Sequence, residues 1–412
     1  MSRDEAMVCC ALATSQDSPP STRPAAGDAP AQAPCCAVPA PPPSPESPAS
    51  CCPGPSSSGP RPEAGGELPG YRRWPFVEGW IDTPVGPVPR VRSRLDATDV
   101  LGRWQMRWGI GRDRYRLAPG LYAVGRPGGG SPVLVTANYK MTFDLLRRDL
   151  AGLDAWILVL ETYGINVWCA AGKGTFGTAE VVRRVRATGL SRVVSHRRLL
   201  LPQLGAPGVA AHEVRRECGF SVVFGPVRSA DIGAFLGAGM AATPAMRTVT
   251  FTALERFVLT PVELAGTLRH AAWVAAAIAV SAGFGPGFYS LSGAWIRGVA
   301  GVAALAGTVV AGAVATPVLL PLLPWRAFSA KGALVGAAVA LLGVAAFGFP
   351  GGYGFLALLL GVSAGSSYLA MSFTGATPFT SPSGVEREMR RALPWQVGAA
   401  ALAVVFWFAS AF

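Results

Sequence analysis

The sequence predicts an α/β domain followed by an all-α transmembrane domain of five helices, with a disordered N-terminal tail. Three observations lead to this fold class. Strand-like and helix-like segments alternate between residues 71 and 250. Only eight Asp, Glu, Lys or Arg residues lie beyond residue 270, too few for a soluble domain of that length. The first 70 residues hold 16 of the 36 prolines and six of the eight cysteines. We therefore expect a tail over 1–70, an α/β domain over 71–250, a linker over 251–269 and membrane helices over 270–412.

The tail has too little periodic apolar content to offset the entropy lost on ordering, so it is expected to be disordered. No sustained apolar segment follows Arg3, and no secretory signal is expected. The cysteines form adjacent pairs at 9–10, 35–36 and 51–52, without the spacing of zinc ligands. Paired thiolates could hold a soft metal such as Hg(II), but compositional drift explains the pairs more simply.

The α/β domain is expected to contain strands at 131–136, 156–160, 193–194, 199–201 and 221–224, and helices at 142–153, 178–188, 210–218 and 229–236. The first helix carries Phe143, Leu146 and Leu150 on one face. The apolar run 156–160 is typical of a strand buried on both faces of a parallel sheet. This alternation predicts a doubly wound sheet, which binds ligands in the loops after its strands. Those loops are 136–140, 161–177, 202–208 and 225–228.

Membrane spans are expected near 270–288, 298–323, 332–350, 352–373 and 395–412, with Pro317 and Pro321 kinking or shortening the second. A buried helical bundle in a soluble protein is the alternative. Basic residues follow spans two and four, whereas the loops after spans one and three are nearly uncharged. The positive-inside rule then places the α/β domain in the cytoplasm and the C-terminus outside. We expect a multi-pass protein of the cytoplasmic (inner) membrane.

These patterns exclude a purely cytosolic enzyme and a secreted disulfide-rich module. The net charge of +12 beside membrane spans reflects topology, and no basic patch with interleaved aromatics indicates nucleic-acid binding. The spacing of Gly172, Gly174 and Gly177 matches a dinucleotide-binding turn only weakly, because the turn does not follow its strand directly and no acidic residue ends the next strand.

Cys169 is the main candidate for chemistry. Its simplest interpretation is a small buried hydrophobe, but it follows a strand end, where α/β sheets bind ligands. Asn166 could cap a short helix and place Cys169 in its first turn, where the helix dipole and Lys173 would lower the thiol pKa. Small neighbours leave room for a flat, bulky group. An anionic, soft ligand in this position suits a metallocofactor. A nucleophile–base pair of Cys169 with His196 or His212 stays open but has no local support.

Residues 166–173, Asn-Val-Trp-Cys-Ala-Ala-Gly-Lys, resemble the cap-helix signature of the mercury-methylating corrinoid proteins, a family of membrane-bound bacterial and archaeal proteins. The resemblance extends through 119–125, 135–140, 202–208, 225–228 and 374–384, and covers about residues 80–412. A distant relative of that family, the corrinoid iron–sulfur protein of the acetyl-CoA pathway, shares an equivalent loop but lacks this cysteine and the membrane spans. The cysteine-rich tail departs from the family pattern.

The resemblance implies a Rossmann-like domain that binds a corrinoid (a cobalamin-type cobalt cofactor), with the Cys169 thiolate as catalytic residue and lower axial ligand of cobalt. The implied cofactor-binding residues are Asn166, Val167, Trp168, Cys169, Ala170, Ala171, Gly172 and Lys173, together with Thr136, Ala137 and Asn138 on the neighbouring loop. A thiolate donates electron density to the metal. It thereby favours transfer of a methyl group to an electrophile such as Hg(II).

The implied activity is a methyltransferase that converts Hg(II) to methylmercury. Its implied partners are a methyl donor protein of the tetrahydrofolate pathway and a ferredoxin-like iron–sulfur protein as reductant. A reducing, anaerobic cytoplasm suits this chemistry and an intracellular chain with eight cysteines. Two alternatives stay open. One is a corrinoid methyl carrier of the acetyl-CoA or one-carbon pathway. The other is a membrane metal transporter, although the spans carry almost no ionisable residues.

Overall fold

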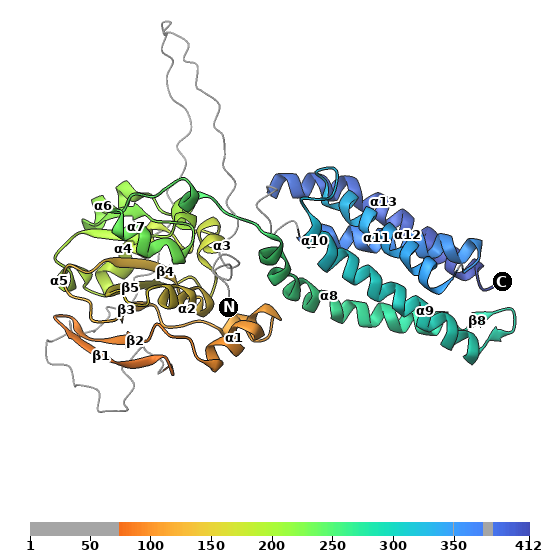
Figure 1. Cartoon of the computed structure of the whole chain (residues 1–412), viewed down its shortest axis with the longest axis horizontal. Coiled ribbons are helices and arrows are strands. Elements are labelled where there is room, and N and C mark those ends of the chain that lie inside the picture. Colours follow the sequence, from red (N-terminus) through yellow and green to blue (C-terminus); the bar gives the residue numbers. More distant parts are fainter. Residues whose placement is uncertain (1–73, 349, 374–381) are drawn as a thin grey trace, which may run out of the picture.

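The computed structural model describes residues 74–348, 350–373 and 382–412. An α/β domain lies at one end of the molecule and a bundle of long helices at the other (Figure 1). The predicted tail and most of the 374–384 loop lie outside the described residues.

The α/β domain is built on a seven-stranded sheet in the order β1-β2-β3-β5-β4-β6-β7. The strands are β1 (Val77–Thr83), β2 (Gly86–Val91), β3 (Gly120–Val124), β4 (Val133–Ala137), β5 (Ala155–Leu160), β6 (Arg198–Leu201) and β7 (Ser221–Phe224). Strands β5, β4, β6 and β7 run parallel, while β3 is antiparallel to β5 and β1 antiparallel to β2. The predicted α/β class is therefore confirmed, but the sheet is mixed, and the hairpin β1–β2 and the strand β3 extend it beyond the predicted strands.

Helices cover both faces of the sheet. On one face, α2 (Lys140–Asp149) and α7 (Ile232–Gly237) pack their apolar side chains against Ile157 and Val159. On the other face lie α4 (Thr178–Ala187), α5 (Leu190–Val193) and α6 (Ala211–Cys218), which pack against Leu158 and Leu160. All six residues of β5 are buried, as its apolar run predicts.

The strand predicted at 193–194 is wrong. Val193 ends α5, and the side chains of Val193 and Val194 pack into the core on the α4 face of the sheet. The short β-branched pair therefore serves helix packing. Helix α2 also ends at Asp149, before the predicted end at 153, because the chain turns at Gly152 with a φ of 81°.

The other helices of the domain connect these elements, and two of them lie at the carboxyl ends of the strands. They are α1 (Ala97–Arg107), η2 (Arg112–Arg114), α3 (Val167–Gly172), η3 (Gln203–Gly208), η4 (Ser229–Asp231) and η5 (Ala245–Arg247). Helix α3 follows β5, and η3 follows β6, so both lie at the carboxyl ends of the strands, where the sequence predicts a ligand site.

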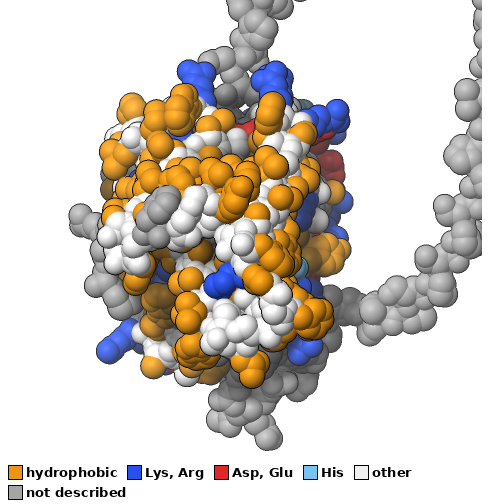
Figure 2. Space-filling view, turned by 90° about the vertical axis from the view of Figure 1, so that its right-hand side faces the viewer, with side chains coloured by type: hydrophobic (Ala, Val, Ile, Leu, Met, Phe, Trp, Pro, Cys, Tyr) orange, Lys and Arg blue, Asp and Glu red, His pale blue; other side chains and the backbone are white. Residues whose placement is uncertain are grey.

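The described residues include five helices long and apolar enough to cross a membrane, the number predicted. They comprise α8 (Ala253–Ser281), Leu291–Leu319, α11 (Phe328–Phe347), α12 (Gly352–Ser372) and the 384–409 part of α13 (Pro382–Ala409). The second contains α9 (Leu291–Val309), a π-helical turn, Val310–Ala315, and α10 (Thr316–Leu319), so it is irregular just before Pro317 and ends before Pro321. Seen from the bundle end, the surface is mostly hydrophobic, with few charged side chains at its centre (Figure 2).

Residues 253–269 are the first half of α8 and not the predicted linker. A capping box between Thr252 and Glu255 begins the helix well before the apolar stretch. The first span correspondingly ends at Ser281, and a small hairpin of β8 (Phe284–Gly285) and β9 (Phe288–Tyr289) leads into α9.

Candidate cofactor-binding site

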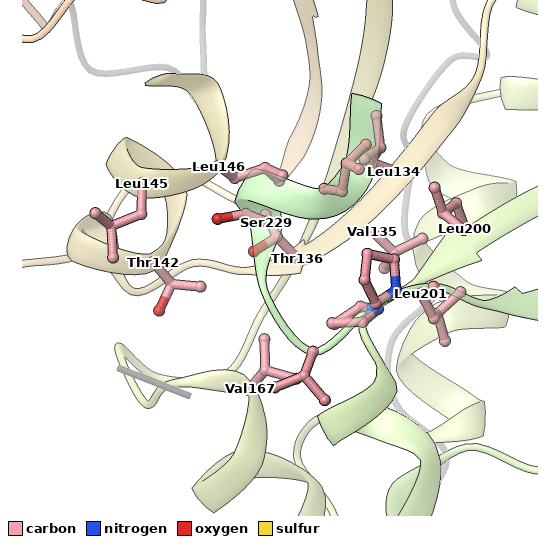
Figure 3. A pocket seen from close by; sticks show the side chains of 15 residues that line it. Leu134, Val135, Thr136, Thr142, Leu145, Leu146, Val167, Leu200, Leu201 and Ser229 are labelled. Carbon is pink, nitrogen blue, oxygen red and sulfur yellow. The ribbon is translucent and has the colours of Figure 1, made fainter. Parts of the chain in front are cut away.

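A pocket lies where the chain reverses its direction across the sheet. Strand β4 leads through α2 to β5 on one side, whereas β6 leads through α6 to β7 on the other. Open α/β sheets bind ligands in the crevice at such a reversal. The pocket is lined by the ends of β4 and β6, by the loop after β7, by α2 and by Val167 of α3. Figure 3 shows Thr142 and Leu145 of α2 on one side of it and Leu200 and Leu201 of β6 on the other.

Among the predicted residues at the end of β4, Thr136 lines this pocket. Thr136, Ala137 and Asn138 are all buried, with at most 2% of each exposed. The Thr142 hydroxyl, which also lines the pocket, is buried and has no hydrogen-bond partner among the residues that the structure describes. An unpaired buried hydroxyl is costly unless something binds to it. Thr142 is thus a pocket residue that the sequence prediction missed, since its position on α2 resembled that of any core helix residue.

Asn138 holds the loop that leads to α3. Its side-chain oxygen accepts hydrogen bonds from the Thr162 hydroxyl (2.9 Å) and the Gly164 amide (3.0 Å). Its side-chain nitrogen donates to a carboxylate oxygen of Glu161 at 2.7 Å. Two loops of the predicted site are therefore tied together by one amide group. Tyr163 follows in a left-handed conformation with a φ of 56°, and its side chain is exposed.

Helix α3 is capped as predicted. The Asn166 side chain accepts a hydrogen bond of 2.9 Å from the Cys169 amide, which fixes Cys169 in the first turn of a six-residue helix. Cys169 is half-buried and forms no disulfide with Cys218, the other cysteine that the structure describes. The thiol therefore has a fixed position at the carboxyl end of β5, beside the reversal point.

The predicted low pKa of this thiol is not found. Burial raises the pKa of Cys169 above its ordinary value. The Asn166 side-chain hydrogen bond and the positive charges of Lys173 and Arg112 oppose the rise without cancelling it. The thiol is therefore protonated near neutral pH, and it has to lose a proton to become a metal ligand.

The other predicted residues of α3 divide into two groups. Val167, Ala170 and Ala171 are buried in the core, whereas Trp168 is half-buried and Gly172 and Lys173 are exposed. Helix α3 packs against η3, and this approach is close: a Cβ on Gly208 would collide with the Phe176 carbonyl oxygen and lie 3.0 Å from the Ala171 Cα. The small side chains on this side of α3 are thus explained by helix–loop packing.

The sequence offered His196 and His212 as possible partners of Cys169. The His196 ring forms a hydrogen bond of 2.9 Å with the Ser131 carbonyl oxygen. His196 precedes β6, so it lies at the amino ends of the parallel strands, whereas Cys169 lies at their carboxyl ends. His212 is exposed on α6. The three-glycine turn follows the helix α3 and not a strand, so the dinucleotide interpretation lacks its structural context. Within the described ranges, no three His, Cys, Asp or Glu side chains gather to form a metal site.

A buried charge network joins α1 to α2, the helix that lines one side of the pocket. Lys140 Nζ donates to Asp99 at 2.8 Å and Asp144 at 2.6 Å, and Arg147 bonds to the same two carboxylates at 2.6 and 2.9 Å. None of the four side chains is more than 5% exposed. Burial raises the pKa of Asp144, whereas at Asp99 the bonds and charges of Lys140 and Arg147 outweigh burial and lower the pKa. The spacing of Lys140, Asp144 and Arg147 on one helix face was the available sequence signal.

Comparison with known proteins finds similarity over the α/β domain. Residues 99–236, from α1 to α7, match a family described as CO dehydrogenase/acetyl-CoA synthase delta subunit. Similar curated proteins are named acetyl-CoA decarbonylase/synthase complex subunit gamma. The protein of Archaeoglobus fulgidus is 33% identical over 127 residues, 30% of this chain and 27% of the relative. That of Methanopyrus kandleri is 35% identical over 128 residues, with the same shares. The chain thus spans about a quarter of the length of these relatives.

Proposed function

We propose that the α/β domain is a Rossmann-like domain that binds a corrinoid at the carboxyl ends of the neighbouring strands β4 and β6, with Cys169 as the lower axial ligand of cobalt. The observation that carries this proposal is the position of Cys169. It occupies the first turn of a capped helix beside the pocket at the sheet reversal. The similarity to acetyl-CoA decarbonylase/synthase subunits over residues 99–236 supports the same kind of chemistry.

The residues present fit such a group. Cys169 supplies one soft donor that is half-buried. Its backbone N–H donates a hydrogen bond to the Asn166 side chain, which holds the residue in place. The unpaired Thr142 hydroxyl supplies a hydrogen-bonding group for a polar substituent in the pocket. Lys173 and Arg112 favour the anionic form of the ligand when the thiol proton leaves.

When bound, the corrinoid supplies a cobalt centre that can carry a methyl group. Cys169 would give up its proton and serve as an electron-donating ligand of that metal. Asn166 keeps the sulfur in the helix turn, and Asn138 keeps the loop before that helix against β4. These residues position the ligand and limit its motion, since each bond is made to a backbone amide.

We propose Hg(II) as the methyl acceptor and methylmercury as the product. A thiolate ligand would favour release of a cobalt-bound methyl group to an electrophile, and a soft, thiophilic cation is such an acceptor. The cycle then requires a low-potential electron donor, for which we propose a ferredoxin-like iron–sulfur protein. It also requires a methyl donor protein of the tetrahydrofolate pathway. The resemblance carried by residues 166–173 supports this choice.

The second candidate is a corrinoid methyl carrier of one-carbon metabolism. The names of the similar proteins favour it directly, because each is a subunit of an acetyl-CoA decarbonylase/synthase complex. The similarity ends before α8, so it carries no information on the five candidate membrane helices. Under this proposal the acceptor is a partner protein of acetyl-CoA synthesis.

For either acceptor we propose that the protein is anchored in the cytoplasmic membrane with the α/β domain inside. Arg326 lies between the second and third spans, Lys331 lies in the first turn of the third, and Arg387, Arg390 and Arg391 lie at the start of the fifth. An up-and-down path through five spans puts these residues on the side of the α/β domain, as the positive-inside rule requires.

The test is to purify the full chain and the variants Cys169→Ala and Cys218→Ala from membranes. Cobalt content, the absorption spectrum and methyl transfer from methylated corrinoid are then measured with Hg(II) and with an acetyl-CoA-forming partner. We expect C169A to lose sulfur ligation and methylmercury formation while C218A keeps both. Transfer to the acetyl-CoA-forming partner without transfer to Hg(II) would establish the second candidate. Full methylmercury formation by C169A would refute the ligand assignment.

A further inference from the structure

Helix α1 buries charged side chains and exposes apolar ones. The side chains that it buries against the domain include three charged groups: Asp99, Arg103 and Arg107. The side chains that it and the following turn expose are large and apolar: Leu101 (59% exposed), Trp104 (51%), Trp108 (39%) and Ile110 (61%). A surface helix of a soluble domain normally shows the opposite pattern.

The inversion is built into the fold. Asp99 is held inside by Lys140 and Arg147 of α2, and the Asp96–Asp99 capping box fixes the start of the helix. The helix therefore cannot rotate to bury its tryptophans without breaking a buried charge network. Leu101, Trp104 and Trp108 follow each other at spacings of three and four residues, so they form one continuous face. We call Leu101, Trp104, Trp108 and Ile110 the apolar face of α1.

Helix α1, which carries this face, lies beside a membrane helix. It contacts α8, and both lie where the α/β domain meets the bundle (Figure 1). Just after the apolar face, the charge of Arg112 acts on Glu263 of α8. At about 1.5 Å per residue, the stretch of α8 from Glu263 to Ser281 is about 27 Å long. That length is close to the ~30 Å of a bilayer hydrocarbon core. Arg269 and His270 are exposed about two turns after Glu263, near enough for their polar ends to extend toward the same headgroups. Glu263 and Arg112 therefore lie near the level of one membrane boundary.

The chemistry of the region matches that boundary. Tryptophan side chains concentrate at membrane–water interfaces, where an apolar ring and a polar N–H are both satisfied. Three exposed arginines, Arg112, Arg114 and Arg116, follow the apolar face and can pair with lipid phosphates. Arg107 also stacks its guanidinium over the Trp104 ring at 5.8 Å.

We propose that the apolar face of α1 inserts into the headgroup–acyl boundary of the same bilayer that α8 crosses, and so docks the α/β domain on the membrane surface. The occupant is lipid, because α1 contacts a membrane-crossing helix and Arg112, just after the face, lies near the level where the hydrocarbon ends. The docking fixes the orientation of the domain that carries Cys169 relative to the membrane. Without it, only the chain segment 238–252 between α7 and α8 would connect the domain to the membrane helices. This inference does not depend on the identity of the cofactor or the methyl acceptor.

The test uses the full chain in vesicles of phosphatidylcholine and phosphatidylglycerol, with or without phosphatidylcholine brominated near the glycerol end of its acyl chains. The tryptophan emission of the variant Trp104→Phe/Trp108→Phe is subtracted from that of the unaltered chain, which isolates the two tryptophans. We expect this difference emission to fall at least twofold in brominated vesicles and to resist quenching by aqueous iodide. Each single variant, W104F and W108F, gives part of the same signal if the double variant does not fold.

The matched control is Trp80→Phe. Trp80 is half-buried on β1, an edge strand of the sheet, and its difference emission is expected to be the same in both kinds of vesicle. Difference emission of Trp104 and Trp108 that bromine leaves unchanged would overturn the proposal. If iodide quenches it as well, the face is open to water and its occupant is a soluble protein.

Discussion

If Cys169 is the cobalt ligand, as proposed, its protonated state gives corrinoid ligation a defined pH dependence. Burial raises the pKa of this thiol, so in the protein without cofactor it carries its proton near neutral pH. Only the thiolate binds the metal. Each ligation event must therefore release one proton, and ligation must strengthen as the pH rises toward the thiol pKa.

The size of the effect follows from that single proton. Below the thiol pKa the ligation constant rises tenfold per pH unit, or about 1.4 kcal/mol. From about pH 6 to about pH 8 the expected gain is about 100-fold, or about 2.7 kcal/mol. An unburied cysteine would level off within about one unit of pH 8.5, whereas the raised pKa of Cys169 extends the rise beyond that range.

The assay is a spectroscopic titration of the cofactor-free protein with aquocobinamide, a corrinoid without a lower base of its own. The logarithm of the ligation constant is plotted against pH, and we expect a slope of about one. Cys169→Ala should bind more weakly and with no slope. Cys218→Ala is the matched control, because Cys218 is also a half-buried thiol with a raised pKa but lies at the end of α6.

A wild-type slope of zero would mean that the thiol is already ionised or does not bind the metal. A slope that persists in C169A would assign the proton to another group. Either result would refute the link between burial of Cys169 and its function as a ligand.

Three further predictions concern the scaffold of the site. Asn166→Ala removes the cap of a six-residue helix, so we expect about 1 kcal/mol of lost stability by denaturant unfolding and a several-fold weaker ligation in the same titration. Gly208→Ala places a methyl group against the backbone of α3 and its loop, and a thermal melt should show a loss of about 1–3 kcal/mol. Asp144→Asn leaves Lys140 and Arg147 with one carboxylate between them. We expect a loss of about 3–5 kcal/mol in urea unfolding, and a stability within 1 kcal/mol of wild type would show that the network is not a closed ion cluster.

The local features of the site could be predicted from the sequence. Asn166 three residues before Cys169 was enough to place a capped helix after a buried strand, because capping depends only on neighbouring residues. The thiol pKa could not be predicted in the same way. It depends on burial, which results from the packing of the whole domain around α3 and not from the residues next to Cys169 in the sequence.

The distinction between local signals and long-range packing also explains which strands and helices were predicted correctly. Strand β5 was predicted because its burial on both faces leaves a continuous apolar run. Strand β2 contains Pro87 and Pro89, which argue against a strand, and is tolerated because it joins an edge hairpin. The start of α8 was missed because the apolar stretch was taken to define the helix, although the capping box of Thr252 and Glu255 was visible in the sequence.

The buried network joins the proposed membrane-docking helix to the proposed cofactor site through consecutive hydrogen bonds. Asp99 of α1 accepts from Lys140, the first residue of α2, whose backbone follows directly after the Asn138 loop. Asn138 in turn binds the Gly164 amide in the loop that leads to Cys169. Each link is buried or half-buried, so none is easily replaced by water. Buried hydrogen bonds and two short chain segments therefore connect α1 to the loop that precedes Cys169. If α1 docks on the bilayer as proposed, the contact that orients the domain and the loop that holds the proposed ligand belong to one packed unit.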